Sequence, residues 1–298
     1  MPDGNAERIS QRRKTDWHYN PPGSDWKHHG PLPLSFSFMP RTGGVWRHSR
    51  RSGLEYRDVG VTAASKGTMS QRHIRAAWGR AGARDAYISD DVEFYYLHVM
   101  EGSVRLETST GEAVILGPGD TVVMPPFNFN PRVFEYTGDF EAMEFTTQGA
   151  LDCIETSERK AGREPGPIAT EGTIITRERP DSYLPGDGPR KFFSYRDLGA
   201  AQSTGGLIHI HVVGIVNGED VPPAGTGWHT HSMDQVFFPF VGYLQIAVEG
   251  FGQVKMRRGD VMVIPAGLRH LVDAFTPDYY TTEICIPNDY LTTATPTP

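Results

Sequence analysis

The sequence is poor in the features that mark disulfide-bonded and membrane-bound proteins. Its 298 residues include only two cysteines, Cys153 and Cys285, so no disulfide framework is expected and both thiols are taken to be reduced. No apolar run reaches the length of a membrane span, and the first residues lack the hydrophobic segment of a signal peptide. These absences favour a cytoplasmic protein with no membrane partner.

An excess of positive charge is also missing. The net charge is -7, and residues 1–57 alone hold ten Lys/Arg against five Asp/Glu, so the remaining residues carry -12. This acidic body argues against nucleic acid as a partner. The basic beginning of the chain is compatible with an arm on an acidic surface and equally with a solvated tail.

Several catalytic and structural patterns are absent as well. We find no Gly-rich phosphate loop, no nucleophile elbow and no Ser-His-Asp pattern, which argues against nucleotide-binding proteins and serine hydrolases. Long stretches of strong helix formers are scarce, whereas glycine (33) and proline (23) are plentiful. This balance favours an all-β fold with many tight turns.

An internal repeat organises the chain. Four residues recur at a spacing of 140 positions: Gly102, Gly119, Asp120 and Pro125 match Gly242, Gly259, Asp260 and Pro265. Between the two glycines of each copy, apolar and polar residues alternate around a central glycine, which is typical of a β-hairpin. Regularly spaced short strands in two similar halves predict two tandem antiparallel jelly-roll barrels.

The repeat also predicts the domain organisation. We expect an N-terminal arm over 1–49, a first barrel over 50–150, a linker over 151–187, a second barrel over 188–291 and a tail over 292–298. The stretch LDCIETSERKAG in the linker is typical of a short helix that ends at Gly162.

Three histidines in the second copy carry the clearest chemical signal. His229 and His231 are alternate residues of an expected strand, so both side chains can point into a barrel. Pro265 and Gly267 indicate a tight turn from which His270 can approach the same point. Three neutral imidazoles that converge in this way form a site for a divalent transition metal with open positions for other ligands.

The segments around these histidines resemble the two motifs of the cupin superfamily. Gly225-Thr-Gly-Trp-His229-Thr-His231-Ser-Met-Asp-Gln235 resembles G-x5-H-x-H-x3,4-E-x6-G, although its first glycine lies closer to the histidines. Gly259-Asp-Val-Met-Val-Ile-Pro265-Ala-Gly267-Leu-Arg-His270 resembles G-x5-P-x-G-x2-H-x3-N. The resemblance implies two tandem cupin barrels, that is, a bicupin, and a homodimer.

Two positions depart from the motifs. Gln235 stands where the motif has glutamate, and Ala274 stands where it has asparagine. The loss of the glutamate leaves neutral ligands around the metal, so the site should prefer a chelating anion as substrate. Gln235 can bind the metal weakly through its amide oxygen or hydrogen-bond to a bound water or substrate, and we assign it the catalytic orienting role.

The first copy lacks the three histidines. The positions 140 residues before the three histidines and Gln235 hold Ser89, Asp91, Asn130 and Tyr95. This set contains one carboxylate and no imidazole, so we expect the first barrel to be metal-free and degenerate.

Other residues are weaker candidates for substrate binding. His209 and His211 alternate with apolar residues and point to one side, either toward the pocket or outward over an apolar core. Phe237 shares the parity of Gln235 and either lines the cavity or belongs to the core. Arg269 can pair with a substrate carboxylate or lie on an exposed loop.

A three-histidine site without the glutamate resembles the non-haem iron dioxygenases among cupins. The resemblance implies an Fe(II)-dependent dioxygenase that uses O2 on a small chelating substrate such as an aromatic diol, a hydroxy acid or a β-dicarbonyl. Zn, Mn, Ni or Cu are alternative metals. The alternatives in function are a redox-neutral lyase, isomerase or decarboxylase, and a bicupin that only binds a ligand.

Overall fold

The structure is a computed structural model, and strands make up most of what it describes. It describes residues 6–7, 34–48, 53–84, 94–107, 113–124, 134–147, 173–186, 190–204, 208–215, 225–288 and 290–298. The helices in these residues are single turns: α1 (Val61–Ala64), α2 (Ala200–Ser203), η2 (Ala77–Gly79) and η4 (Pro180–Ser182). The helix expected in the linker lies outside the described residues. Within them, no helix has the length and apolar character needed to cross a membrane.

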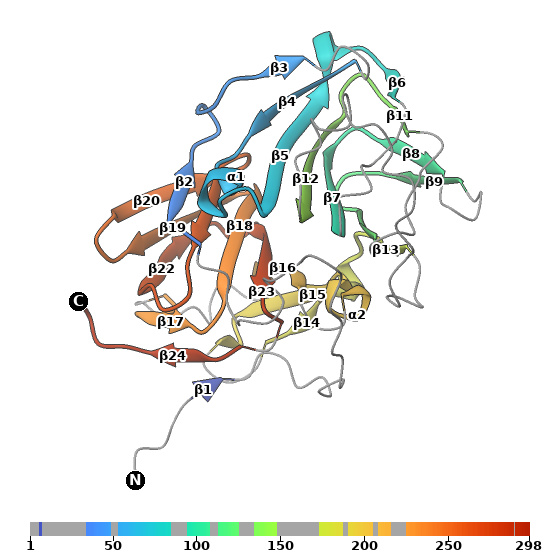
Figure 1. The fold of residues 1–298 in the computed structure, drawn as a ribbon. Coiled ribbons are helices and arrows are strands. Elements are labelled where there is room, and N and C mark those ends of the chain that lie inside the picture. Colours follow the sequence, from blue (N-terminus) through green and yellow to red (C-terminus); the bar gives the residue numbers. More distant parts are fainter. Residues whose placement is uncertain are drawn as a thin grey trace, which may run out of the picture.

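The first barrel consists of two antiparallel sheets (Figure 1). In order across the larger sheet, its seven strands are β13 (Ile174–Thr176), β10 (Thr121–Met124), β7 (Phe94–Glu101), β12 (Glu141–Thr147), β5 (Met69–Ala76), β4 (Leu54–Asp58) and β3 (Arg47–His48). The smaller sheet contains β6 (Gly82–Arg84), β11 (Phe134–Tyr136), β8 (Val104–Glu107) and β9 (Ala113–Leu116). The expected hairpin between Gly102 and Gly119 is formed by β8 and β9.

The second barrel has the same plan. In order across its larger sheet, its strands are β14 (Leu184–Pro185), β15 (Phe193–Asp197), β16 (His209–Ile215), β23 (Tyr280–Ile286), β18 (Asp234–Val241), β21 (Val261–Ile264) and β2 (Ser37–Met39). The other sheet contains β1 (Ala6–Glu7), β24 (Thr292–Ala294), β17 (His229–His231), β22 (His270–Phe275), β19 (Tyr243–Val248) and β20 (Gly252–Arg257). The prediction of an all-β chain with two tandem barrels is confirmed.

The two larger sheets pack against each other, and residue alternation separates two kinds of core. One face of β7, β12, β16, β18 and β23 forms an apolar core shared by the barrels, with Tyr96, Phe145, Ile210, Phe238 and Ile284 among its members. The opposite face lines each barrel's own interior. Because the side chains of a strand alternate in direction, one strand serves both cores. The odd-numbered residues of β16, β18 and β23 therefore point into the second barrel.

Six strands lie outside the expected barrel boundaries and still join the sheets: β1, β2, β3, β13, β14 and β24. β2 precedes the first barrel in sequence but pairs with β21 of the second, and β13 follows the first barrel and pairs with its β10. β24, in the expected tail, pairs with β17. These segments show little alternation of apolar and polar residues, so their place in a sheet depends on the strands with which they pair. The domain boundaries themselves stay a prediction.

Polar side chains also join the barrels. The guanidinium of Arg57, on β4, is fully buried and donates hydrogen bonds to the carbonyl oxygens of Gly43 (3.0 Å) and Gly259 (2.5 Å). The Thr282 hydroxyl, on β23, lies 2.9 Å from Nδ1 of His98, on β7. These contacts fix one barrel on the other, in addition to the apolar core.

Candidate metal centre

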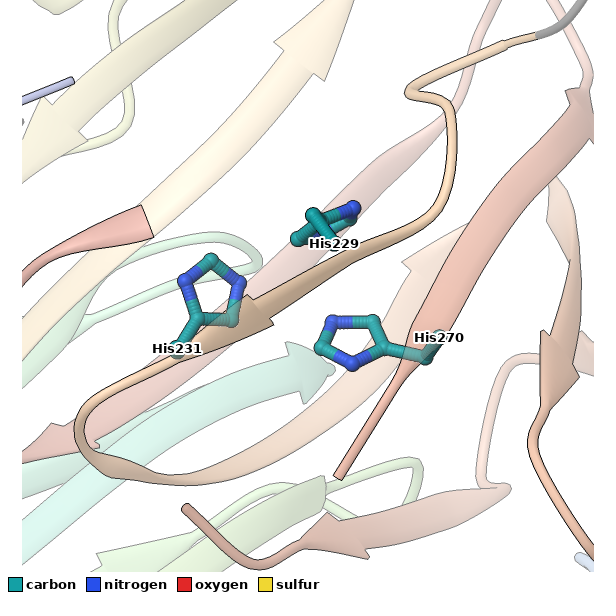
Figure 2. Close-up of side chains that lie close together, drawn as sticks. All are labelled: His229, His231 and His270. Atoms are coloured by element: carbon teal, nitrogen blue, oxygen red, sulfur yellow. The ribbon is translucent and has the colours of Figure 1, made fainter. Parts of the chain in front are cut away.

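Three histidines of the second barrel come together on two neighbouring strands. His229 and His231 leave the same face of β17, and His270, the first residue of β22, is the register partner of His229. One ring nitrogen of each lies within 4.8 Å of the others, and all three side chains are buried. Figure 2 shows the three rings gathered over β17 and the beginning of β22. The convergence expected from their spacing is therefore present.

A hydrogen bond at Nδ1 orients each ring. Nδ1 of His229 donates to the Gly227 carbonyl (2.8 Å), and Nδ1 of His270 donates to the Leu268 carbonyl (2.9 Å). Nδ1 of His231 shares a hydrogen bond with the Thr292 hydroxyl (2.8 Å). A proton on Nδ1 leaves Nε2 with a free lone pair, which is the arrangement that second-shell partners impose on metal-binding histidines.

The loops before each histidine are shaped by glycine and by backbone hydrogen bonds. Gly225 has φ +61°, and a Cβ there would lie 1.9 Å from the Val272 carbonyl oxygen, so only glycine fits. The Gly267 N–H donates to the carbonyl of His231 (2.8 Å), and the Ala266 N–H donates to the carboxylate of Asp234 (2.9 Å). The turn that leads to His270 is thus tied to the strands that carry the other ligand candidates.

The three imidazoles are neutral at ordinary pH. Burial lowers the pKa of His229 and of His231 well below the usual value, and the charges of the neighbouring His270 and of Arg190 lower these pKa values further. Burial also lowers the pKa of His270, to about 4. Neutral imidazole is the form that binds a metal ion.

Gln235 lies on the interior face of β18. It is the register partner of Cys285 on β23, its side chain is buried, and its Oε1 has no hydrogen-bond partner among the described residues. A buried amide oxygen without a partner is costly, unless a ligand, a water or a metal completes it.

The structure brings further groups to the interior that the sequence analysis did not single out. Glu283 on β23 accepts a hydrogen bond from Nε2 of His211 (2.9 Å), and Nδ1 of His211 lies 2.7 Å from Nε2 of His209. The ligand atoms of His211, Glu283 and Cys285 also lie within 4.8 Å of one another. Both candidate metal clusters found among the described residues therefore belong to the second barrel.

The signals for these additional residues differ in strength. Glu283 is a lone acidic residue in the strand Tyr-Thr-Thr-Glu-Ile-Cys-Ile, and its presence between buried positions is a signal that can be read from the sequence. Thr292, which contacts His231, lies in the expected tail and has no such signal. The same holds for Arg190, in the expected start of the second barrel.

The weaker sequence candidates occupy different positions. His209 and His211 are buried and face the interior of the second barrel, so the outward orientation does not apply. Phe237 is a member of the apolar core inside the same barrel. Arg269 forms a partly exposed ion pair, its Nε donating to Glu249 (2.7 Å), so its position lends no support to a substrate contact.

The first barrel presents a different set at the corresponding positions. Tyr95 is buried and donates a hydrogen bond to Glu144 (2.9 Å), whereas Ser89, Asp91 and Asn130 lie outside the described residues. No group of metal-ligand type is found among the described residues of this barrel.

The donor set of the second barrel fits a divalent transition metal. Three neutral imidazoles, together with a Gln235 oxygen that has no partner among the described residues, are nitrogen and oxygen donors of the type that iron, manganese, nickel and zinc accept. The cluster of His229, His231 and His270 can therefore hold a metal ion.

Comparisons with known proteins agree with this architecture. A family model described as the EutQ-like cupin domain matches residues 78–160, less than half of the chain. The chain has the cupin fold. A sequence comparison with curated proteins finds no match.

Solved structures of bicupin size match nearly the whole chain. A protein from Pseudomonas aeruginosa described as glyoxylate-induced has a TM-score of 0.62 and 15% identity, covering 94% of this chain and 97% of its own. A mutant of Bacillus subtilis oxalate decarboxylase has 0.57 and 15%, covering 86% and 78%. Protein YlbA from Escherichia coli has 0.58 and 11%, covering 87% and 94%. At these identities the likeness shows the fold alone.

Proposed function

We propose that this chain is a metal-dependent dioxygenase that holds Fe(II) at His229, His231 and His270 and acts on a small chelating organic anion. The observation that carries the proposal is the buried cluster of three imidazoles. The Nδ1 hydrogen bonds of His229 and His270 to carbonyl oxygens leave their Nε2 atoms free, and the Thr292 hydroxyl can accept from Nδ1 of His231, which would leave the third Nε2 free as well. A bound iron would supply the electron transfer that the reaction of O2 with an organic molecule requires.

The charges around the cluster support an anionic substrate. The three histidines are neutral. Burial is the main reason why the pKa values of His229 and His231 are low, and Arg190 is near enough for its positive charge to lower them further. A substrate carboxylate, catecholate or enolate would balance both the metal and this guanidinium. Gln235 would orient the substrate or the oxygen molecule, and the apolar core at Phe237 would exclude water from one wall.

Oxygen uptake tests the proposal directly. The purified protein is reconstituted anaerobically with Fe(II), and O2 consumption is recorded over a panel of aromatic diols, β-diketones, thiols and hydroxy acids. We expect uptake with at least one chelating member and none with His229→Ala. Absence of uptake across the panel by protein that retains its iron would refute the dioxygenase assignment.

The second candidate function is a redox-neutral lyase, isomerase or decarboxylase that uses Mn, Ni or Zn as a Lewis acid. The observation that favours it is the partly buried carboxylate of Glu283, which can hold or transfer a proton inside the barrel. The fold is also shared with a protein named oxalate decarboxylase. Turnover of oxalate or a hydroxy acid by the Mn(II)-loaded protein without O2 would support this redox-neutral reaction. Tight binding of such an acid without turnover would instead indicate a bicupin that only binds a ligand.

We also propose that two copies of the chain form a homodimer, as its resemblance to cupins implies. Light scattering coupled to gel filtration measures the mass of the particle. A mass equal to one chain at micromolar concentration would exclude the dimer.

A further inference from the structure

Glu283 lies at the centre of the larger sheet of the second barrel. β23, which carries it, runs between β16 and β18 (Figure 1), and the register places His211 opposite Glu283 on one side and Phe237 on the other. Gln235 is two residues before Phe237, so it is the diagonal neighbour of Glu283 on the same face. The carboxylate therefore lies between an imidazole and a primary amide.

The nitrogen and the oxygen of the Gln235 amide have different surroundings. Its N–H group acts on Glu283 as a hydrogen-bond donor that helps to lower the pKa of the carboxyl, because a carboxylate can only accept. Its Oε1 is buried without a partner among the described residues. The nitrogen and oxygen of an amide point in different directions, so a fixed nitrogen also fixes where the oxygen is aimed.

Two histidines hold the carboxylate in place. If Nε2 of His211 donates to Glu283 (2.9 Å), Nδ1 of His211 must accept, and Nε2 of His209 at 2.7 Å is its donor. Both ring nitrogens of His211 are thus used. This chain of buried hydrogen bonds restricts the rotamers of Glu283 and keeps it beside Gln235.

The first barrel repeats the arrangement without the metal site. Glu144 on β12 is the register partner of Leu97, as Glu283 is of Phe237, and its diagonal neighbour Tyr95 donates to it at 2.9 Å. Opposite Glu144 on the other side lies Arg72, where the second barrel has His211. A glutamate at this register position is therefore common to both barrels, but of the two only Glu283 has a neighbour whose oxygen lacks a partner among the described residues.

Glu283 is also charged. Burial alone would raise the pKa of its carboxyl, but the hydrogen bond from His211 and the charge of Arg190 act in the opposite direction and outweigh burial, so the pKa is lowered. A carboxylate that accepts from an amide N–H polarises the amide and makes its oxygen a stronger donor of electron density.

We infer that Glu283, anchored by His211 and His209, is a positioning residue that holds the Gln235 amide with its oxygen toward the three-histidine cluster. It places behind that oxygen the negative charge that Gln235 itself lacks. This inference rests on the proposed function only through metal binding, and it holds for a dioxygenase and for a Lewis-acid enzyme alike.

Co(II) binding to the purified full-length chain tests the inference without reference to turnover. Affinity is measured by competition with a chelator, and the visible spectrum reports the ligand set. We expect Glu283→Ala to lower the affinity roughly 10–100-fold, as loss of second-shell partners does, and to change the spectrum. Glu283→Gln, which keeps an acceptor oxygen for Gln235, should show a smaller loss of Co(II) affinity. The matched control Glu144→Ala, at the same register position of the first barrel, should keep wild-type affinity and spectrum.

A double variant separates positioning from a general loss of structure. If Glu283 acts through Gln235, Glu283→Ala adds no further loss of affinity in a Gln235→Ala background. Full additivity, or wild-type affinity and spectrum in folded Glu283→Ala, would overturn the inference. Should Glu283→Ala fail to fold, Gln235→Ala decides, because wild-type affinity in that variant leaves Glu283 nothing to act through. Failure of the wild-type protein to bind Co(II) would instead refute the metal site itself.

Discussion

His229 and His270 face each other across β17 and β22 as register partners, with ring centroids 4.3 Å apart. In the sequence, β18, the β19–β20 hairpin and β21 lie between the two residues, yet the sheet brings them to adjacent positions. A metal held by this pair and His231 would bridge the two strands directly.

Removal of one of these imidazoles should abolish stoichiometric metal binding. In His229→Ala, two histidines remain, and the rise in melting temperature that metal produces in the wild type should vanish. In the wild type, metal at 100 times its dissociation constant should raise the free energy of unfolding by about 2.7 kcal/mol. Metal content by elemental analysis and thermal melts with and without metal check this. His48→Ala, at an exposed position of the first barrel, is the control and should behave as the wild type.

The stability of the metal-free protein should fall as the pH is lowered below about 6.5. Burial lowers the pKa of His98 from 6.5 to about 3, and the charge of Arg196 contributes in the same direction. Between these values the unfolded chain binds more protons than the folded one, so the free energy of unfolding rises with pH across the window. One such group contributes up to about 1.4 kcal/mol per pH unit.

The variant His98→Asn isolates this contribution. Its side chain keeps an acceptor for the hydroxyls of Tyr96 and Thr282 but does not titrate. Denaturant unfolding at several pH values between 4 and 6.5 should show a shallower pH dependence in the variant. Equal slopes would mean that His98 is not the group responsible.

Loss of Arg57 should destabilise the joined barrels. The Arg57→Met variant leaves the carbonyl oxygens of Gly43 and Gly259 without their donor in a buried environment, at a cost of about 3 kcal/mol. Denaturant unfolding measures this. Arg105→Met, which breaks an exposed pair with Glu135, should change the free energy of unfolding by less than about 1 kcal/mol. Similar losses in both variants would contradict the structural role of Arg57.

A side chain at Gly225 should disturb the metal centre. In Gly225→Ala, the new Cβ meets the Val272 carbonyl oxygen, so the loop that carries the Gly227 carbonyl, the partner of His229, must move. We expect lower metal affinity in addition to lower stability. Gly252→Ala is the matched control, because Gly252 also has positive φ (+84°) but no atom within 4 Å of a Cβ. Equal metal affinities in the two variants would exclude this role of the loop.

The repeat and the histidine spacing could be interpreted without coordinates because each depends on short-range rules. A glycine turn between alternating residues favours a hairpin through local geometry, and the parity of His229 and His231 follows from the strand period alone. The two-barrel arrangement followed from these local patterns, and the convergence with His270 and the cupin fold from the resemblance of its segments to the cupin motifs.

Residues that act through a neighbouring strand could not be found in this way. Glu283 is identified as a partner of Gln235 only by the order of β16, β23 and β18, and Thr292 reaches His231 only because β24 pairs with β17. The orientation of His209 and His211 was also undecided, since both faces of a central strand are buried when two sheets pack together.

The sequence by itself therefore determined the strand pattern, the two-barrel architecture and the three histidines, because these depend on periodicity within a segment. The tertiary structure alone decided which strands are neighbours, and hence which buried polar groups complete the site, because pairing between distant strands is selected by the packing of the whole sheet.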